Sequence, residues 1–437
     1  MSLDRTLASN PVPGLARKDL AAVDMAEARA GAPATVKQSR VLIYAMNYTP
    51  ELIGCGRYTG EIGENLRREG ARVDVVTTPP HYPGWAARDG YRAGRYVRED
   101  RDGVTIHRCP IGLSKQMKGF GRMWAPLSFA LSSAPVVMWR ILRDRPTHVF
   151  CVEPTLLAAP AAVLAAKCVG ARTILHVQDL EFDAAFAVGH VKGGGLKSLV
   201  FGFERILLKG FDHVVTISEK MQSRLLEKGV RGERMNIVRN WVDTASIFPL
   251  PGANGFRDEL GLAADDFVAL YAGNIGVKQA LGLVMDAAET LIDAPITFVI
   301  AGDGPEKAAL VARNLPNVKF LPLQPEARLN ELLNLADVHV LPQLSGAADL
   351  VLPSKLGGIL ASGKPLLAMA DANSEIGIFL ADEAVLVPSG DVVAMARHLR
   401  AMATKPERQT RAPATSRALK ALSKASSMQA LNTLLSR

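Results

Sequence analysis

Short apolar runs rich in β-branched residues alternate with longer amphipathic stretches from residue 40 onward. In the first half of the chain the runs are VLIYAM (41–46), VDVVTT (73–78), VTIHRC (104–109), HVFCV (148–152), RTILHV (172–177) and HVVTI (213–217). The stretch 56–70 has apolar or small residues at helical spacing and ends at Gly70, a natural helix stop signal. Strands that alternate with helices in this way predict a parallel sheet with right-handed crossover connections.

The same alternation starts again after residue 264. Its runs are FVALYAG (267–273), ITFVIAG (296–302), VKFLPL (318–323), VHVLP (338–342), PLLAMA (365–370) and AVLVP (384–388). Residues 241–264 interrupt the pattern with Pro, Gly and Asn and are interpreted as a linker. We therefore predict an α/β fold of two Rossmann-like, doubly wound domains, at 39–240 and 265–403, that face an interdomain cleft. In such sheets ligands bind at the carboxyl ends of the strands.

The two ends of the chain lack this alternation. Residues 1–38 are rich in Ala, Pro, Arg and Asp without an apolar period, which predicts a loosely ordered N-terminal extension. Residues 404–437 have Leu and Met at roughly helical spacing among basic residues. They predict a C-terminal helix that docks by its apolar side and turns its basic face outward.

Composition narrows the classes of protein to consider. The 437 residues, 48% hydrophobic and 22% charged, suit two hydrophobic cores and exclude collagen-like, coiled-coil and wholly disordered chains. The four cysteines show no paired spacing, so neither a disulfide framework nor a zinc site is predicted, and a reducing, cytosolic location is favoured. The single Asp-x-Asp, Asp100-Arg101-Asp102, precedes Gly103 and is interpreted as a solvated turn, so no metal site is predicted.

The net charge of +8 is concentrated in two segments. Residues 88–145 hold twelve basic and five acidic residues, and residues 405–437 hold seven and one. Basic residues without interleaved aromatic residues or a known module argue against a nucleic-acid partner. We expect instead a peripheral contact with an anionic membrane surface.

The uncharged run 123–139 bears on that expectation. It lies between Arg122 and Arg140, follows two lysines, and contains two prolines. It falls short of the ~20 residues that a spanning helix needs, and the N-terminus lacks the apolar core of a signal peptide. A transmembrane span is therefore not expected, whereas an interfacial contact and an interior helix that covers the sheet both remain open.

Loops after the strands of the first half offer residues for a cleft. The loop 47–56 ends in two glycines that allow close backbone approach at a helix N-terminus, although a GxGxxG fingerprint is absent. The loop PPHYPGW (79–85) offers rings that could stack on a sugar. A tight strand–helix turn and a packed Trp85 are the structural alternatives. The candidate acceptor and cleft residues are Gly54, Gly56, Arg57, His81, Tyr82 and Asn240.

Three glycine-rich loops follow strands of the second half, at 273–278, 302–304 and 349–358. Glycines, lysines and helix N-termini at one edge of a sheet are typical of a phosphate site, so we predict that these loops bind a nucleoside diphosphate group. The candidate donor-binding residues are Gly273, Asn274, Gly276, Lys278, Gly302, Asp303, Gly304, Asp349, Pro353, Ser354, Lys355 and Leu356.

Several ordered motifs between residues 40 and 400 carry a family resemblance. They include PELIGCGRYTGEI (50–62), LHVQDLEFDAAF (175–186), YAGNIGVKQAL (271–281), VIAGDGPE (299–306) and DLVLPSKLGGILASGKP (349–365). In order and spacing the chain resembles glycosyltransferase family four, which has the two-domain GT-B fold, and within it the bacterial colanic acid and exopolysaccharide enzymes. The resemblance implies that the C-terminal helix crosses back to the first domain.

The resemblance also assigns roles. It implies that Asn274 and Lys278 hold the donor diphosphate, that backbone amides from Pro353 to Leu356 complete this site, and that Asp303 and Gly304 lie near the nucleoside. The paired glutamates of the family fall at Leu350 and Gly358, with Asp349 beside the first, and its phosphate-loop arginine is replaced by Asn274. Gln178 stands where the family has a histidine near the cleft, and Asp179 follows it. The expected catalytic residues are therefore Asp179, Gln178 and Lys278, whereas His176 is expected to pack inside.

The implied activity is that of a retaining, metal-independent hexosyltransferase. The donor would be a UDP- or GDP-linked sugar, no cofactor is expected, and stabilising the negative charge of the leaving diphosphate would be the main catalytic task. The acceptor would be a saccharide carried by polyprenyl diphosphate at the inner face of the cell membrane. The alternatives are a GT-B epimerase or phosphorylase, and a nucleotide-sugar-binding partner protein without activity.

Overall fold

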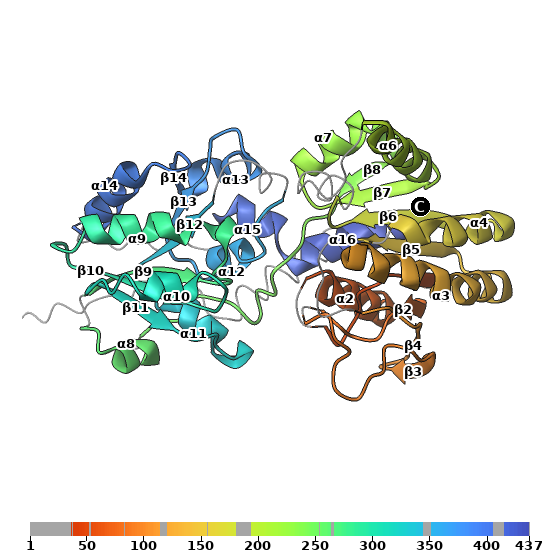
Figure 1. Cartoon of the computed structure of the whole chain (residues 1–437), viewed down its shortest axis with the longest axis horizontal. Coiled ribbons are helices and arrows are strands. Elements are labelled where there is room, and N and C mark those ends of the chain that lie inside the picture. Colours follow the sequence, from red (N-terminus) through yellow and green to blue (C-terminus); the bar gives the residue numbers. More distant parts are fainter. Residues whose placement is uncertain are drawn as a thin grey trace, which may run out of the picture. The chain divides into compact units, whose positions relative to one another are not determined.

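The computed structural model forms two compact units, each built on one sheet (Figure 1). One unit contains residues 31–240 and 427–437, and the other contains most of residues 241–426. The structure describes residues 36, 38–51, 54–82, 84–113, 120–154, 156–180, 194–252, 254–263, 266–343, 351–404 and 415–436. Most of the predicted N-terminal extension therefore lies outside the described residues, and so does Asp349.

The first sheet has eight strands in the order β3-β4-β2-β1-β5-β6-β7-β8, all parallel except β3, which pairs antiparallel with β4. The strands are β1 (Arg40–Tyr44), β2 (Arg72–Thr77), β3 (Val97–Arg101), β4 (Val104–Arg108), β5 (His148–Glu153), β6 (Arg172–Val177), β7 (His213–Thr216) and β8 (Met235–Ile237). Asp102 and Gly103 have positive φ angles in the turn between β3 and β4, and Asp100 and Asp102 are exposed there. The Asp-x-Asp segment is thus a solvated hairpin.

Helices cover both faces of this sheet. The helices are α2 (Cys55–Arg68), α3 (Phe120–Asp144), α4 (Ala159–Val169), α6 (Gly194–Lys209) and α7 (Glu219–Glu227). Residues of α3, α4, α6 and α7 pack on Leu42, Val149 and Leu175 in one buried cluster. Gly63 of α2 faces Ile43, which points to the opposite side of the sheet from Leu42.

The second sheet is wholly parallel, in the order β11-β10-β9-β12-β13-β14. Its strands are β9 (Phe267–Ala272), β10 (Ile296–Ala301), β11 (Val318–Leu321), β12 (Val338–Pro342), β13 (Leu366–Met369) and β14 (Val385–Val387). One face packs against α9 (Leu281–Thr290), α10 (Lys307–Val311) and α14 (Val392–Ala403), and the other against α8 (Gly255–Leu260) and α11 (Leu329–Asn334). The short helices α12 (Leu356–Ala361) and α13 (Glu375–Leu380) follow β12 and β13. This doubly wound architecture confirms the predicted fold class.

The predicted linker 241–264 is more ordered than the sequence suggested. It contains α8, whose N-cap is Asn254, and Phe256 of this helix is fully buried against the second sheet. Two asparagines of α11 hold the preceding chain, because Asn330 and Asn334 accept hydrogen bonds from the backbone of Phe248 and Leu250. Pro and Gly in this segment therefore mark turns within a domain.

The C-terminal segment forms two helices where the sequence predicted one. The helix α15 (Arg417–Ala421) belongs to the second unit, and most of α16 (Lys424–Leu435) belongs to the first. Buried Met428, Leu431, Leu434 and Leu435 give α16 the expected apolar side, and Asn65 of α2 donates a hydrogen bond to Asn432. The expected basic outward face is wrong for α16, because its exposed residues are Gln429, Ala430 and Thr433.

Candidate functional site

Glu51 joins the two loops that follow β1 and β2. Its buried carboxylate accepts hydrogen bonds from Asn47 Nδ2 (2.9 Å), His81 N (2.9 Å) and Tyr82 N (3.0 Å). Gly56 must lack a side chain here, because a Cβ would lie 2.5 Å from Glu51 Oε2. No sequence pattern points to Glu51, since its role depends on the contact between two loops that lie thirty residues apart.

The rings predicted in this region have different exposures. His81 is buried, and its Nδ1 lies 3.1 Å from Thr78 Oγ1 and 3.0 Å from the carbonyl of Pro79. Tyr82 is partly exposed and covers Gly54, whose φ of +64° favours glycine. Tyr82 also meets Trp85 edge-on with ring centroids 6.3 Å apart. The Tyr82 ring is therefore the most accessible of the three rings, and His81 serves to shape the loop.

Two arginines in this part of the chain have structural roles. Arg108, at the end of β4, is buried and donates to the carbonyls of Thr78 (2.9 Å) and Thr49 (2.8 Å), and it pairs with Glu99. Arg108 therefore links the two loops through their backbone carbonyls. No sequence pattern indicated this role. Arg57, a predicted cleft residue, pairs with Glu61 one turn along α2 at 2.8 Å.

A line of polar side chains leads from β6 to the end of the first domain. Asn240 Nδ2 donates to Gln178 Oε1 (2.8 Å), and Gln178 Nε2 lies 3.2 Å from His176 Nε2. His176 is fully buried, and burial lowers its pKa to about 4. Because His176 is neutral, its Nε2 accepts a hydrogen bond from the Gln178 amide N–H, and its own proton is on Nδ1. The structure therefore brings together Gln178, predicted to be catalytic, and Asn240, predicted to be a cleft residue.

Asp179 differs from its neighbour in the chain. Its side chain is exposed, and Oδ1 accepts a hydrogen bond from the backbone N–H of Leu180 at 2.9 Å. Asp179 is thus an accessible acidic group among the residues described at the end of β6, while Gln178 is held by its partners.

In the second unit, the loops after β9 and β10 interlock through their backbones. Ile275 N donates to Asp303 O (2.8 Å), and Glu306 N donates to Ile275 O (3.1 Å). Gly273, Gly302 and Gly304 have φ angles of 149°, 143° and 156°. A Cβ on Gly302 would collide with the carbonyl of Gly273, and one on Gly304 with that of Ile275. These glycines are required for the close approach of the two predicted donor loops.

Lys355 reaches the first of these loops from the start of α12. Its Nζ donates to Tyr271 Oη (2.6 Å) and lies 4.0 Å from the centre of the Tyr271 ring. Tyr271 Oη in turn donates to the carbonyl of Asn274 (2.6 Å). A Cβ on Gly273 would lie 3.0 Å from Lys355 Nζ, so the glycine leaves the ammonium uncovered. Tyr271 was not predicted as a site residue, because it lies in an apolar strand whose pattern indicates only a buried core.

The charge of Lys355 is held in an unfavourable environment. Burial lowers the pKa of Lys355 to about 7, and no carboxylate pairs with it within the described ranges. Burial also raises the pKa of Tyr271, so the phenol stays protonated and cannot serve as a counter-ion. An anion bound beside Gly273 would supply the missing negative charge.

The remaining predicted donor residues differ in exposure and in local contacts. Asn274 is exposed and its amide donates to Gln279 (3.2 Å). Lys278 is exposed in a short 3₁₀ turn (Val277–Gln279), before the left-handed Ala280 that precedes α9. Asp303 caps its own loop by accepting from Gly304 N (2.9 Å). Ser354 is exposed and Leu356 is buried.

One departure from the expected family pattern lies at a tightly packed position. At Gly358, where the resemblance implies a glutamate, a Cβ would lie 3.1 Å from Leu333 Cδ1, so the leucine side chain would have to shift by a few tenths of an ångström. Leu333, on α11, fills the space beside the glycine. The other departure, at Leu350, lies outside the described residues.

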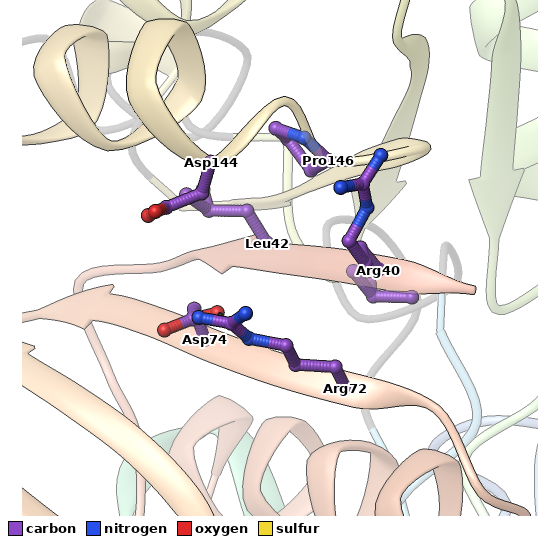
Figure 2. Close-up of a pocket in the computed structure, with 7 residues that line it drawn as sticks. Arg40, Leu42, Arg72, Asp74, Asp144 and Pro146 are labelled. Carbon is purple, nitrogen blue, oxygen red and sulfur yellow. Dashed lines mark ion pairs between the residues drawn. The ribbon is translucent and has the colours of Figure 1, made fainter. Parts of the chain in front are cut away.

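A small pocket lies at the opposite edge of the first sheet (Figure 2). It has a volume of about 10 Å³, room for a single water, and is lined by Arg40 and Arg72 at the amino ends of β1 and β2. Asp74 pairs with Arg140 at 2.9 Å and with Arg72 at 3.5 Å. The pocket is a structural ion-pair cluster at the amino ends of the strands, away from the carboxyl ends where the predicted site residues lie. Among the side chains that the structure describes, no group of three His, Cys, Asp or Glu could hold a metal ion.

Comparison with protein families and known proteins agrees with this arrangement. Residues 54–241 match the glycosyl transferase 4-like domain, and residues 266–405 match the glycosyl transferases group 1 family. The colanic acid biosynthesis glycosyl transferase WcaI of Escherichia coli K12 is 42% identical over 348 residues, which are 77% of this chain and 85% of that protein. The alpha-galactosylglucosyldiacylglycerol synthase of Streptococcus pneumoniae is 29% identical over 38% of this chain and 46% of its own length.

Solved structures show the same fold. The Anabaena protein HepE, crystallised with UDP and glucose, superposes with a TM-score of 0.61 at 16% identity, over 91% of this chain and 99% of HepE. Sucrose-phosphate synthase from Thermosynechococcus elongatus gives a TM-score of 0.63 at 15% identity, over 89% and 96% of the two chains. The chain therefore belongs to glycosyltransferase family four and is a glycosyltransferase with the GT-B fold.

Proposed function

We propose that the protein transfers a hexose from a UDP- or GDP-linked sugar to a saccharide on polyprenyl diphosphate during bacterial exopolysaccharide synthesis. The observation that carries the donor part is Lys355, a half-buried ammonium without an acidic partner in the described parts of the chain. Gly273, which has no side chain, leaves this ammonium accessible. The similarity to WcaI supports the polysaccharide pathway. Family membership favours this activity over the epimerase, phosphorylase and non-catalytic alternatives.

The donor diphosphate would bind where the two interlocked loops meet Lys355. Lys355 and the exposed Lys278 would neutralise the charge that develops on the leaving phosphate, and backbone amides of the loops would add hydrogen bonds. We propose that no metal or cofactor takes part, since two ammonium groups can perform this task. The Asp303–Gly304 turn would lie near the nucleoside.

The transfer would retain the anomeric configuration. The bond between the anomeric carbon and the phosphate oxygen breaks, the acceptor oxygen bonds to the same face of that carbon, and the acceptor proton passes to the departing phosphate. Asp179 and Gln178 would orient the acceptor and sugar hydroxyls, with Tyr82 as a stacking surface. We propose a location in the cytoplasm at the inner face of the membrane, where a lipid-linked acceptor would be presented.

A donor panel tests this proposal. The purified protein is incubated with UDP- and GDP-sugars and bacterial lipid extract, and labelled sugar is followed into the lipid phase. One donor should give labelled lipid, with the product linkage of the same anomeric form as the donor by NMR. Absence of transfer with every donor, together with absence of UDP and GDP binding by calorimetry, would contradict the proposed function.

Two lysine variants locate the donor site. Lys355→Gln should weaken diphosphate binding by about tenfold or more, because charge-assisted hydrogen bonds to a phosphate contribute about 1.5–3 kcal/mol. Lys167→Gln, an exposed lysine of α4, is the matched control and should bind as the unmodified protein does. Equal affinities for the two variants would remove the assignment of Lys355.

A further inference from the structure

The helix α3 presents an apolar stripe to the outside of the first domain. Its residues recur at spacings of three and four, and all are exposed: Trp124, Leu127, Leu131, Pro135, Met138 and Leu142. At 1.5 Å per residue this outward stripe is about 27 Å long. Leu131, near its middle, has 65% of its surface exposed. A contiguous apolar surface of this length on a soluble domain indicates an interaction site.

The opposite side of α3 is the part that belongs to the core. Phe129, Val137 and Ile141 are fully buried against the first sheet, and α4 lies beside the helix (Figure 1). By length and composition, Trp124–Asp144 is the one described helix that could cross a membrane. Because its inner side already covers the sheet, α3 can meet a bilayer only along its outward stripe.

Aromatic side chains border the stripe. Tyr96, from the segment before β3, is largely exposed and donates its hydroxyl proton to the carbonyl of Ser132 on α3 at 2.9 Å. Trp139 is half exposed, and the guanidinium of Arg143 lies 4.7 Å from its ring centre. Tyrosine and tryptophan with this mixture of apolar ring and polar edge prefer the boundary between lipid and water.

Arginines form the outer margin. Arg92, Arg95 and Arg98 are exposed in the segment that Tyr96 fastens to α3, and Arg143 and Arg145 are exposed where the helix ends. Arg92 and Arg95 have no acidic partner within the described ranges, and the pairs Arg98–Asp100 and Arg143–Asp144 are long, at 3.7 Å and 4.0 Å. The surface therefore combines an apolar centre with an excess of positive charge at its edge.

This combination decides between two occupants. In a symmetric pair of identical chains each apolar stripe would cover the other, but the arginines would meet the same arginine-rich margin across the interface. An anionic bilayer instead accepts the apolar side chains among its acyl chains and the guanidinium groups among its phosphates. We propose that the outward stripe of α3, with Tyr96, Trp139 and the arginine margin, docks on an anionic lipid surface, with the helix lying in the plane of the interface.

This inference rests on the proposed function in one respect: docking would bring the first domain to a lipid-linked acceptor. Vesicle flotation of the full chain tests it, with vesicles of phosphatidylcholine alone or with phosphatidylglycerol. The protein should float with the anionic vesicles and be released by salt. Leu131→Asn with Leu142→Asn should reduce the membrane partition coefficient by about tenfold or more. Each buried methylene contributes about 0.8 kcal/mol to membrane binding, and the two substitutions remove several.

Matched variants make the result specific. Leu323→Asn with Val393→Asn, two exposed apolar residues of the second unit, should float as the unmodified protein does. Arg95→Gln with Arg143→Gln should abolish the preference for anionic vesicles. The proposal is overturned if the unmodified protein does not float, if both apolar double variants float equally, or if the α3 variant only converts a dimer to a monomer in sedimentation. UDP and GDP affinity, measured on the same samples, reports on the proposed function separately.

Discussion

At the scale of single residues, Lys355 makes donor binding depend on pH. Its pKa of about 7 means that the ammonium is largely neutral above pH 8, whereas a bound diphosphate favours the charged form and raises this pKa. Binding above pH 7 must therefore take up a proton. We expect nucleoside diphosphate affinity to fall between pH 7 and pH 9, by at most about tenfold per pH unit.

Calorimetry in buffers of different ionisation enthalpy measures this proton uptake directly. Lys355→Arg, which stays charged throughout, should show no uptake and a flat affinity over the same range. Tyr271→Phe keeps the ring below the ammonium but removes the hydrogen bond, so its affinity should change without loss of the pH dependence. An affinity of the unmodified protein that does not vary with pH would contradict the prediction.

Gln178 and Asp179 are adjacent in the chain but should respond differently to substitution. Gln178→Ala leaves Asn240 Nδ2 and buried His176 Nε2 without their partner, which should lower the free energy of unfolding by about 1–3 kcal/mol. Asp179→Ala removes an exposed carboxylate and should reduce turnover with little effect on stability. Chemical denaturation measures the loss of stability, and a transfer assay measures the loss of turnover. If Asp179→Ala instead destabilised the protein and Gln178→Ala reduced only turnover, the two assignments would be wrong.

At the scale of elements, the interlocked loops after β9 and β10 should tolerate no side chain at Gly302. Gly302→Ala places a methyl group on the Gly273 carbonyl at a φ of 143°, so we expect a loss of about 2 kcal/mol or more in stability together with weaker UDP or GDP binding. Gly282→Ala, in open space on α9, is the control and should be neutral or stabilising by up to about 1 kcal/mol. Thermal unfolding with and without ligand measures both, and equal midpoints would contradict the steric argument.

The elements also show what the sequence could predict. Each β-branched run with clear turn signals proved to contain a strand, because strands buried on both faces must be apolar. The edge strands β3 and β8 were missed, since VREDR is polar and MNI is only three residues long. The donor loops were found from their glycines. Glu51, Arg108 and Tyr271 were not, because their roles arise from tertiary contacts between distant loops.

At the scale of the whole molecule, the chain leaves the first domain at Asn240 and returns to it in α16. The first domain therefore depends on a helix that is nearly two hundred residues away in sequence. Ser427 Oγ donates to the carbonyl of Arg239 (2.9 Å), and Asn432 meets Asn65 of α2 at 3.3 Å. Buried Leu431 lies between these two contacts on the same helix.

Leu431→Ala in the full chain tests this dependence. Truncation of a buried leucine should cost about 2–5 kcal/mol, and the loss should fall on the first domain although the residue belongs to the C-terminal segment. Gln429→Ala, on the exposed side of α16, should leave stability unchanged. Thermal unfolding gives the size of the loss, and hydrogen exchange gives its location: protection should fall in α2 and the strands β1 and β2. A loss confined to α15 and the second sheet would instead mean that α16 stabilises the donor domain.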